Sequence, residues 1–174
     1  NPVSMLVNTK TSALPFENIF LEYAPKLKDN ELEIVIRCIS EKGFSKSASF
    51  LISLFKESKM GISTHILWTA GNALSIINDK KTYDEIIKIC QNKKFGSSRQ
   101  MLISLLPRIK TDEAYNTLLK CLKDKEIRGH VIQALGNFGR VEAIEILEKL
   151  EVEKGKYEYK AKINALKKLK KSRS

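Results

Sequence analysis

The sequence predicts an all-α fold in which pairs of helices stack in a row. Two segments, 99–121 and 128–150, align at an offset of 29 positions, which places Arg99 on Arg128. Apolar residues recur at helical spacing within both segments, and no segment of useful length alternates between apolar and polar residues as a strand would. Internal repeats of about 20 to 50 residues indicate a repeat architecture. The sequence therefore predicts an α-solenoid, or α-α superhelix, of about four and a half helix pairs.

The chain before the repeats is expected to supply an N-terminal cap. Residues 1–14 are expected to form a poorly ordered or extended segment. Pro15 and the acidic Glu17 predict a helix start within 15–30, because proline and acidic side chains favour the first helical turn. One repeat domain is expected over residues 15–174. Because the chain does not begin with Met, we expect it to be either a trimmed chain or a fragment.

Four repeats and a half repeat are expected after this cap. The segments 64–74 and 129–139 align at an offset of 65 positions, which places His65 on His130. A weaker copy covers about 31–58. The expected repeats span about 31–61, 62–96, 97–126 and 127–156, followed by a half repeat and basic cap at 157–174.

The clearest repeat is expected to contain helices at 127–138 and 141–150. Gly139 stands between them, where a helix C-terminus favours a residue that tolerates positive φ. Neither helix could bury its apolar face alone, but stacked pairs could. The residues expected to form these faces are Ile127, Val131, Ala134, Leu135 and Phe138 in the first helix and Val141, Ile144, Ile146, Leu147 and Leu150 in the second.

Two turns contain a threonine that precedes an expected helix. Thr82 is followed three residues later by Glu85, which is the spacing of a capping box. Thr111 is followed at the same spacing by Ala114, which lacks the acidic side chain. Only Thr82 is therefore predicted to form a capping box.

The segment IRGHVIQALGNFGRVEAIEILEKL at 127–150 resembles a HEAT repeat of the short bacterial type that also occurs in phycocyanobilin-lyase-like proteins. The matching features are a β-branched residue and an arginine at the start of the first helix, then AL followed by G, a turn, and AIxxL. The resemblance covers about residues 31–170. It implies that an aspartate in the preceding turn pairs with the opening arginine, as Asp124 and Arg128 would. Arg99 follows FGSS and has no such aspartate, so a complete ladder of these pairs is not expected.

The composition is that of a soluble folded protein, with 43% hydrophobic and 29% charged residues. No apolar run approaches the length of about 18 residues that a membrane span needs, so no membrane contact is expected. Cys38, Cys90 and Cys121 are widely spaced in apolar helical stretches and form no metal-binding motif. We expect three small buried thiols in a cytoplasmic protein that needs no metal and no cofactor.

The net charge of +11 is carried by the second half of the chain. Residues 1–87 contain ten basic and ten acidic residues, whereas 88–174 contain 21 basic and ten acidic ones. A helix with Tyr159, Ile163, Leu166 and Leu169 on one face is expected to close the row, with lysines on its outer surface. The candidate contacts for a polyanion are Lys120, Lys123, Lys160, Lys162, Lys167, Lys168, Lys170 and Lys171.

The sequence contains none of the common catalytic or phosphate-binding motifs, so no catalytic residue is proposed. His65 and His130 occupy equivalent repeat positions, which favours a structural role over metal binding.

We expect a noncatalytic scaffold that binds a protein partner through a concave face lined by the second helix of each pair. The alternative is a nucleic-acid-associated module that uses the basic C-terminal half and is related in architecture to HEAT-like alkylpurine DNA glycosylases. The chain has only 7% aromatic residues and one Trp, so this analogy concerns architecture alone. The sequence does not indicate an oligomeric state.

Overall fold

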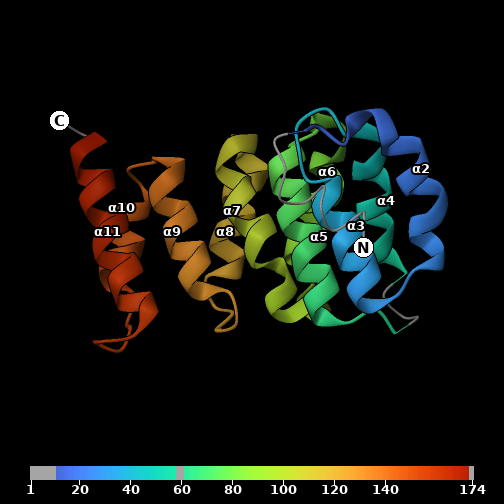
Figure 1. Ribbon diagram of the computed structural model, residues 1–174. Coiled ribbons are helices and arrows are strands. Elements are labelled where there is room, and N and C mark those ends of the chain that lie inside the picture. Colours follow the sequence, from blue (N-terminus) through green and yellow to red (C-terminus); the bar gives the residue numbers. More distant parts are fainter. Residues whose placement is uncertain (1–10, 58–60, 173–174) are drawn as a thin grey trace. The chain divides into compact units, whose positions relative to one another are not determined.

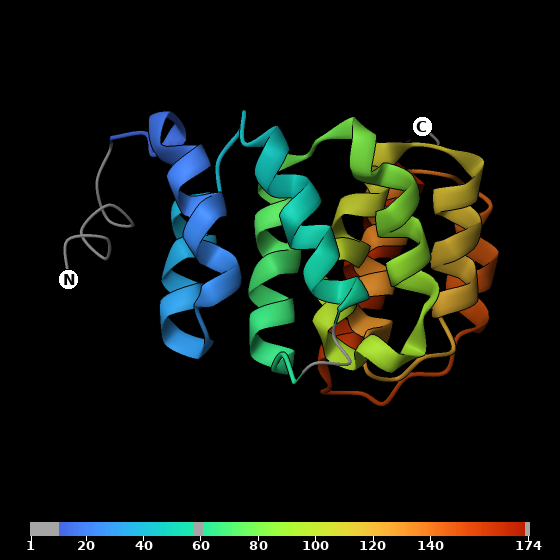
Figure 2. The same ribbon diagram turned by 90° about the vertical axis from the view of Figure 1, so that its right-hand side faces the viewer.

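The computed structural model describes residues 11–57 and 61–172, and these residues form helices and turns with no strand among them (Figures 1 and 2). The chain divides into two compact units, the first ending at Ile86 and the second beginning at Ile87. The expected disorder of residues 1–14 concerns mainly residues 1–10, which lie outside the described ranges. Leu14 already begins a 3-10 turn.

The first helices of the described ranges begin where Pro15 and Glu17 predicted a helix start, while their role as a cap stays a prediction. The 3-10 turn η1 (Leu14–Phe16) leads into α2 (Glu17–Tyr23) and η2 (Ala24–Lys26). The carboxylate of Glu17 is buried and accepts hydrogen bonds from the backbone N–H and the hydroxyl of Ser47, both at 2.9 Å. Ser47 lies in the first turn of α4, where unpaired N–H groups favour a negative charge. Glu17 therefore caps α4.

The rest of the first unit consists of paired helices. The helices α3 (Asp29–Cys38) and α4 (Ser45–Lys56) are followed by α5 (Thr64–Ile77), the turn η4 (Lys80–Thr82) and the start of α6 (Tyr83–Gln91). The helix α5 contacts both α3 and α4.

The capping box predicted at Thr82 is not formed. Thr82 lies inside η4, and its hydroxyl donates to the carbonyl oxygen of Asp79, whose side chain caps the turn instead. The carboxylate of Glu85 forms an ion pair with Lys56 at 2.9 Å. Thr111, which has no acidic partner three residues later, does cap a helix: its hydroxyl accepts from the N–H of Ala114 at 3.2 Å.

The second unit contains two layers of helices that follow the end of α6 and the turn η5 (Lys93–Arg99). One layer is made of α7 (Gln100–Ile109), α9 (Arg128–Phe138) and α11 (Tyr157–Ser172), with α9 in contact with both of the others. The second layer is made of α8 (Asp112–Cys121) and α10 (Ala143–Lys149). The helix α8 contacts α7 and α9, and α10 contacts α9 and α11. The expected repeat boundaries stay a prediction.

The core prediction is right for α9 except at Phe138, and it is only partly right for α10. Val131 and Leu135 are fully buried, as are Ile127 and Ala134, and Gly139 ends α9 with φ of 83° as expected. In α10 only Ala143 and Leu147 are buried. Val141 and Ile146, both expected in the core, are exposed: Val141 precedes α10, which begins at Ala143, and Ile146 lies on the accessible side of this seven-residue helix. Phe138 is half-buried and packs on the ring of Tyr115.

The helix α11 packs on α9 through small residues. A Cβ atom added to Gly136 would lie 2.7 Å from the Cα atom of Ala165, so the two backbones approach more closely than larger side chains allow. The buried residues of α11 are Ala161, Ala165 and Leu169. The predicted face is therefore wrong except for Leu169: Ile163 is exposed, and Tyr159 and Leu166 are only half-buried.

Candidate functional site

A groove of about 700 Å³ lies between α8 and α10 in the second unit, and we call it the α8/α10 groove. Its apolar surface comes from side chains at the end of α8 and along α10, of which Leu119 and Leu150 are half-buried, Ile146 is exposed and Leu122 is buried. The residues that line it are Leu119, Leu122, Lys123, Arg128, Ile146, Lys149, Leu150 and Glu151. Sequence reasoning assigned Ile146 and Leu150 to the core, so it missed this groove.

The rim of the α8/α10 groove is mainly basic. Lys123 and Lys149 are exposed, and Lys149 pairs with Glu145 at 2.6 Å in a solvent-exposed contact that contributes little to stability. Arg128 is less accessible: its Nε donates to the carbonyl oxygen of Leu122, and its Nη1 lies 3.6 Å from Glu158. Glu151 is the single acidic residue in this lining.

The opposite side of α10 has the reverse charge. A shallow depression of about 500 Å³ is lined there by Val141 and Ile144 together with Glu142, Glu145 and Glu148. One short helix therefore separates a basic apolar groove from an acidic apolar surface. A charged ligand would distinguish the two sides.

The pairing of Asp124 with Arg128 that the resemblance implied is not observed. Asp124 Oδ2 instead accepts from Arg99 Nη2 at 2.6 Å, and the Arg99 side chain is only 1% exposed. Arg99 also donates to the carbonyl oxygens of Gly96 and Cys90. Gly96 has φ of 47° and ψ of −133°, and the kinked η5 turn that it allows is held by the buried Arg99.

The eight candidate lysines fall into three groups. Lys120 and Lys123 lie near the end of α8 and are exposed, and Lys123 lines the α8/α10 groove. Three lysines of α11 make side-chain contacts within the unit. The remaining three, Lys160, Lys167 and Lys171, are exposed on α11.

The lysines with contacts connect α11 to its neighbours. Lys162 Nζ donates to the carbonyl oxygens of Glu148 and Leu150, which satisfies acceptors at the C-terminus of α10. Lys170 pairs with the carboxylate of Glu148 at 2.6 Å, and this hydrogen bond lowers the pKa of Glu148. Lys168 donates to Asn137 on α9 at 2.7 Å.

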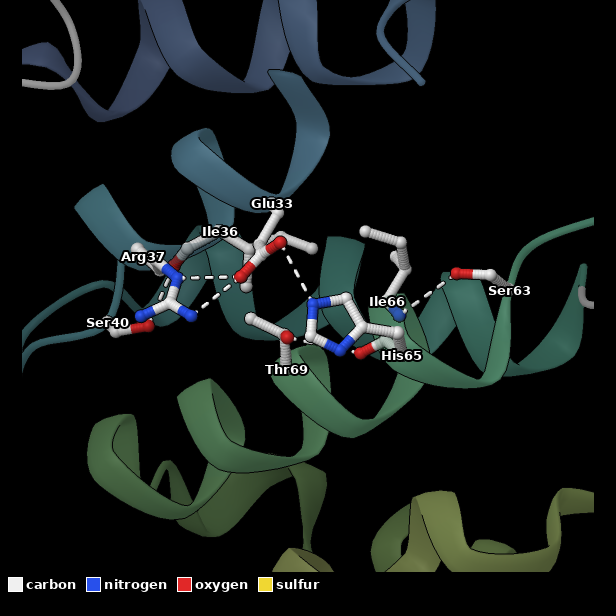
Figure 3. Close-up of polar contacts among 8 residues, drawn as sticks. All are labelled: Glu33, Ile36, Arg37, Ser40, Ser63, His65, Ile66 and Thr69. Atoms are coloured by element: carbon white, nitrogen blue, oxygen red, sulfur yellow. Dashed lines mark hydrogen bonds and ion pairs between the residues drawn. The ribbon is translucent and has the colours of Figure 1, made fainter. Parts of the chain in front are cut away.

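The two histidines have different surroundings although they occupy equivalent repeat positions. Figure 3 shows that Glu33 lies between Arg37 and His65: its carboxylate accepts from Arg37 at 2.6 Å and lies 2.9 Å from His65 Nε2. The hydrogen bonds from Arg37 and then His65 lower the pKa of Glu33. His130 is half-buried against the ring of Tyr157, and this burial lowers the pKa of His130.

The three cysteines are buried thiols, as expected. Cys121 Sγ donates to the carbonyl oxygen of Cys90 at 3.4 Å, and Cys38 lies in the first unit. Within residues 11–57 and 61–172, no three His, Cys, Asp or Glu side chains are grouped so that they could hold a metal ion.

Part of the chain matches the model of a known repeat family. The family model for HEAT repeats matches residues 83–167, from the first residue of α6 into α11. Residues 83–167 are HEAT repeats. This finding and the all-helical structure confirm the predicted α-solenoid class, while the short bacterial type stays a prediction. Neither the curated proteins nor the solved structures contain a significant match to the chain.

HEAT repeats generally serve in protein interaction and scaffolding, because stacked helix pairs present extended binding surfaces. The α8/α10 groove lies within the matched residues and is formed by the second helices of two consecutive pairs. None of the helices in the described ranges is both long and apolar enough to span a bilayer.

Proposed function

We propose that the chain is a noncatalytic HEAT-repeat module that binds a protein partner in the α8/α10 groove. The observation that carries this proposal is the groove itself, in which apolar side chains of two second-layer helices remain accessible. Grooves of this kind accept the apolar face of an amphipathic helix. Three buried thiols suit a reducing compartment, so we place this function in the cytoplasm.

The charge of the rim defines the chemistry of the partner. Lys123, Arg128 and Lys149 outnumber Glu151 around the groove. An amphipathic segment with acidic residues beside its apolar anchors would complement this rim, and charge complementarity favours specific association. The acidic depression on the other side of α10 would repel the same segment.

A peptide-display selection followed by binding measurements tests this function. We expect the chain to enrich peptides that carry apolar residues at helical spacing together with Asp or Glu. An enriched peptide should lose at least about tenfold in affinity for Ile146→Gln, because this change places a polar amide in the apolar part of the groove. Fluorescence anisotropy with the labelled peptide would measure the dissociation constant.

Ile163→Gln is the matched control, since Ile163 is exposed on α11 and lines neither the groove nor the depression. This variant should bind the peptide as the unmodified chain does. Thermal unfolding of both variants would establish that they fold. Equal binding by Ile146→Gln and the unmodified chain would refute the assignment of this groove.

A further inference from the structure

One face of α11 carries a continuous stripe of exposed lysines. Lys160, Asn164, Lys167 and Lys171 stand at positions i, i+4, i+7 and i+11, which share one side of an α-helix. All four side chains are exposed. We call Lys160, Lys167 and Lys171 the lysine stripe.

The lysine stripe differs electrostatically from the other lysines of α11. Lys162 and Lys170 contact the C-terminus of α10, where the carboxylate of Glu148 compensates their charge. In the part of the chain that the structure describes, no carboxylate forms an ion pair with a lysine of the stripe. The three ammonium groups therefore present uncompensated positive charge to an external ligand.

A second groove, of about 290 Å³, lies beside the stripe between α9 and α11, and we call it the α9/α11 groove. Gln133 and Asn137 of α9 face Lys160 and Asn164 of α11 across it, and no carboxylate belongs to its lining. The amide oxygen of Gln133 accepts from Tyr157 Oη, and that of Asn137 accepts from Lys168. These two contacts leave the amide NH₂ groups as hydrogen-bond donors.

The dimensions of the stripe favour a linear polyanion over a single phosphate. Lys160 and Lys171 are eleven residues apart, which corresponds to about 16 Å along a helix. A nucleic acid strand offers regularly spaced phosphates over such a length, at about 3.4 Å of axis per phosphate in a duplex strand. Several phosphates of one strand could therefore contact the stripe together.

The α9/α11 groove also offers an aromatic surface. Tyr157 stands at the first position of α11, and 53% of its surface is exposed although its ring packs against His130. Proteins that bind single strands combine a positively charged groove with aromatic side chains on which bases stack. An acidic peptide would use the lysines but would have no comparable use for this ring.

We propose that the lysine stripe and the α9/α11 groove bind single-stranded nucleic acid. The lysines contact consecutive phosphates, while Tyr157 and the amides of Gln133 and Asn137 contact bases. This surface shares no residue with the α8/α10 groove. It would thus act in addition to the protein-binding function.

Fluorescence anisotropy with a labelled oligothymidylate of about 15 nucleotides tests this proposal, since known single-strand sites span about 4 to 16 nucleotides. The full chain is compared with Lys160→Gln/Lys167→Gln/Lys171→Gln over a range of salt concentrations. We expect the dissociation constant of the triple variant to rise at least about tenfold. The slope of log K against log salt should become shallower by about 2, because each phosphate contact contributes about 0.7 on a single strand.

The matched control is Lys42→Gln/Lys80→Gln/Lys81→Gln, which removes the same charge from exposed positions of the first unit. Its affinity for the oligonucleotide should stay within about twofold of that of the unmodified chain, because the three replaced lysines make none of the proposed contacts. If net charge alone determined binding, the control and the stripe variant would lose the same affinity. Tyr157→Leu keeps an apolar side chain but removes the stacking surface, and it should weaken binding by about fivefold or more. Melting curves would show whether each variant is folded.

Three results would overturn the proposal. The first is equal binding of the oligonucleotide by the stripe variant and the unmodified chain. The second is tighter binding of a duplex of the same length, which has no accessible bases to stack. The third is displacement of the oligonucleotide by poly-glutamate at equal charge concentration, which would identify an acidic polypeptide as the ligand.

Discussion

Arg99 and Asp124 form an ion pair between the turn before α7 and the turn before α9, with 2.6 Å between Nη2 and Oδ2. Arg99 is almost completely buried, and its other donors bind the carbonyl oxygens of Gly96 and Cys90. One guanidinium therefore connects the end of α6, the η5 turn and the turn that leads into α9. The free energy of unfolding of the second unit should depend strongly on this pair.

Replacement of Asp124 by Ala should lower the free energy of unfolding by about 3 kcal/mol, because it leaves the buried Arg99 charge without its partner. Urea unfolding followed by circular dichroism would measure this loss. Asp112→Ala is the control: Asp112 also pairs with an arginine, Arg140, but its side chain is 84% exposed. The control should cost less than about 1 kcal/mol. Equal losses in the two variants would contradict a special role for the buried pair.

The contribution of Asp124 should depend on pH. Burial raises the pKa of Asp124, but the hydrogen bonds from Arg99 and from the N–H of Glu126 outweigh this effect, so the pKa lies below its ordinary value. The carboxylate therefore stabilises the fold fully above about pH 4, the ordinary pKa of aspartate, and this stabilisation is lost as the pH falls through the lower folded pKa. The stability difference between the unmodified chain and Asp124→Asn should shrink in that acidic range. A difference that grows on acidification would show that the sign is wrong.

Gly136→Ala should loosen α11 from α9. The new Cβ would lie 2.7 Å from the Cα atom of Ala165, and such crowding in a packed core costs about 1 to 3 kcal/mol. Hydrogen exchange should show faster exchange of the α11 amides. Gly139→Ala provides a contrast, because no atom lies within 4 Å of its added Cβ and its cost arises only from φ of 83°. That variant should leave α11 exchange unchanged.

The three thiols should react slowly with Ellman's reagent while the chain is folded. Burial raises the pKa of Cys38, Cys90 and Cys121, so little of the reactive thiolate is present near neutral pH. All three should react rapidly in urea. A thiol that reacts at once in the folded chain would show that its helix packs less tightly than the structure indicates.

The helix pairs could be predicted from the sequence because repetition and apolar periodicity are local properties. Gly139 and the buried face of α9 belong to this class, since the residues that determine them lie within one repeat. The Arg99–Asp124 pair was missed because it joins neighbouring repeats. Its geometry depends on the conformation of Gly96, which no spacing rule reveals.

The faces of α10 and α11 were harder to predict for a different reason. Ile146 and Ile163 were predicted to be buried because they are large and apolar, yet both are exposed. Gly129 and Gly136 let α11 approach α9 closely, at Tyr157 and at the buried Ala165 respectively. Small residues contribute little to a hydrophobicity pattern, so this contact becomes visible only when the two helices are placed together.

The lysine stripe has a further consequence for self-association. Two repeat proteins can associate when the exposed face of a terminal helix in one chain packs against a helix of another chain. A polar outer face on the terminal repeat opposes such association. Two copies that approached each other through the exposed side of α11 would bring like charges together, at a cost that salt reduces. The same ammonium groups that suit a polyanion therefore disfavour end-to-end pairing of this chain, most strongly at low ionic strength.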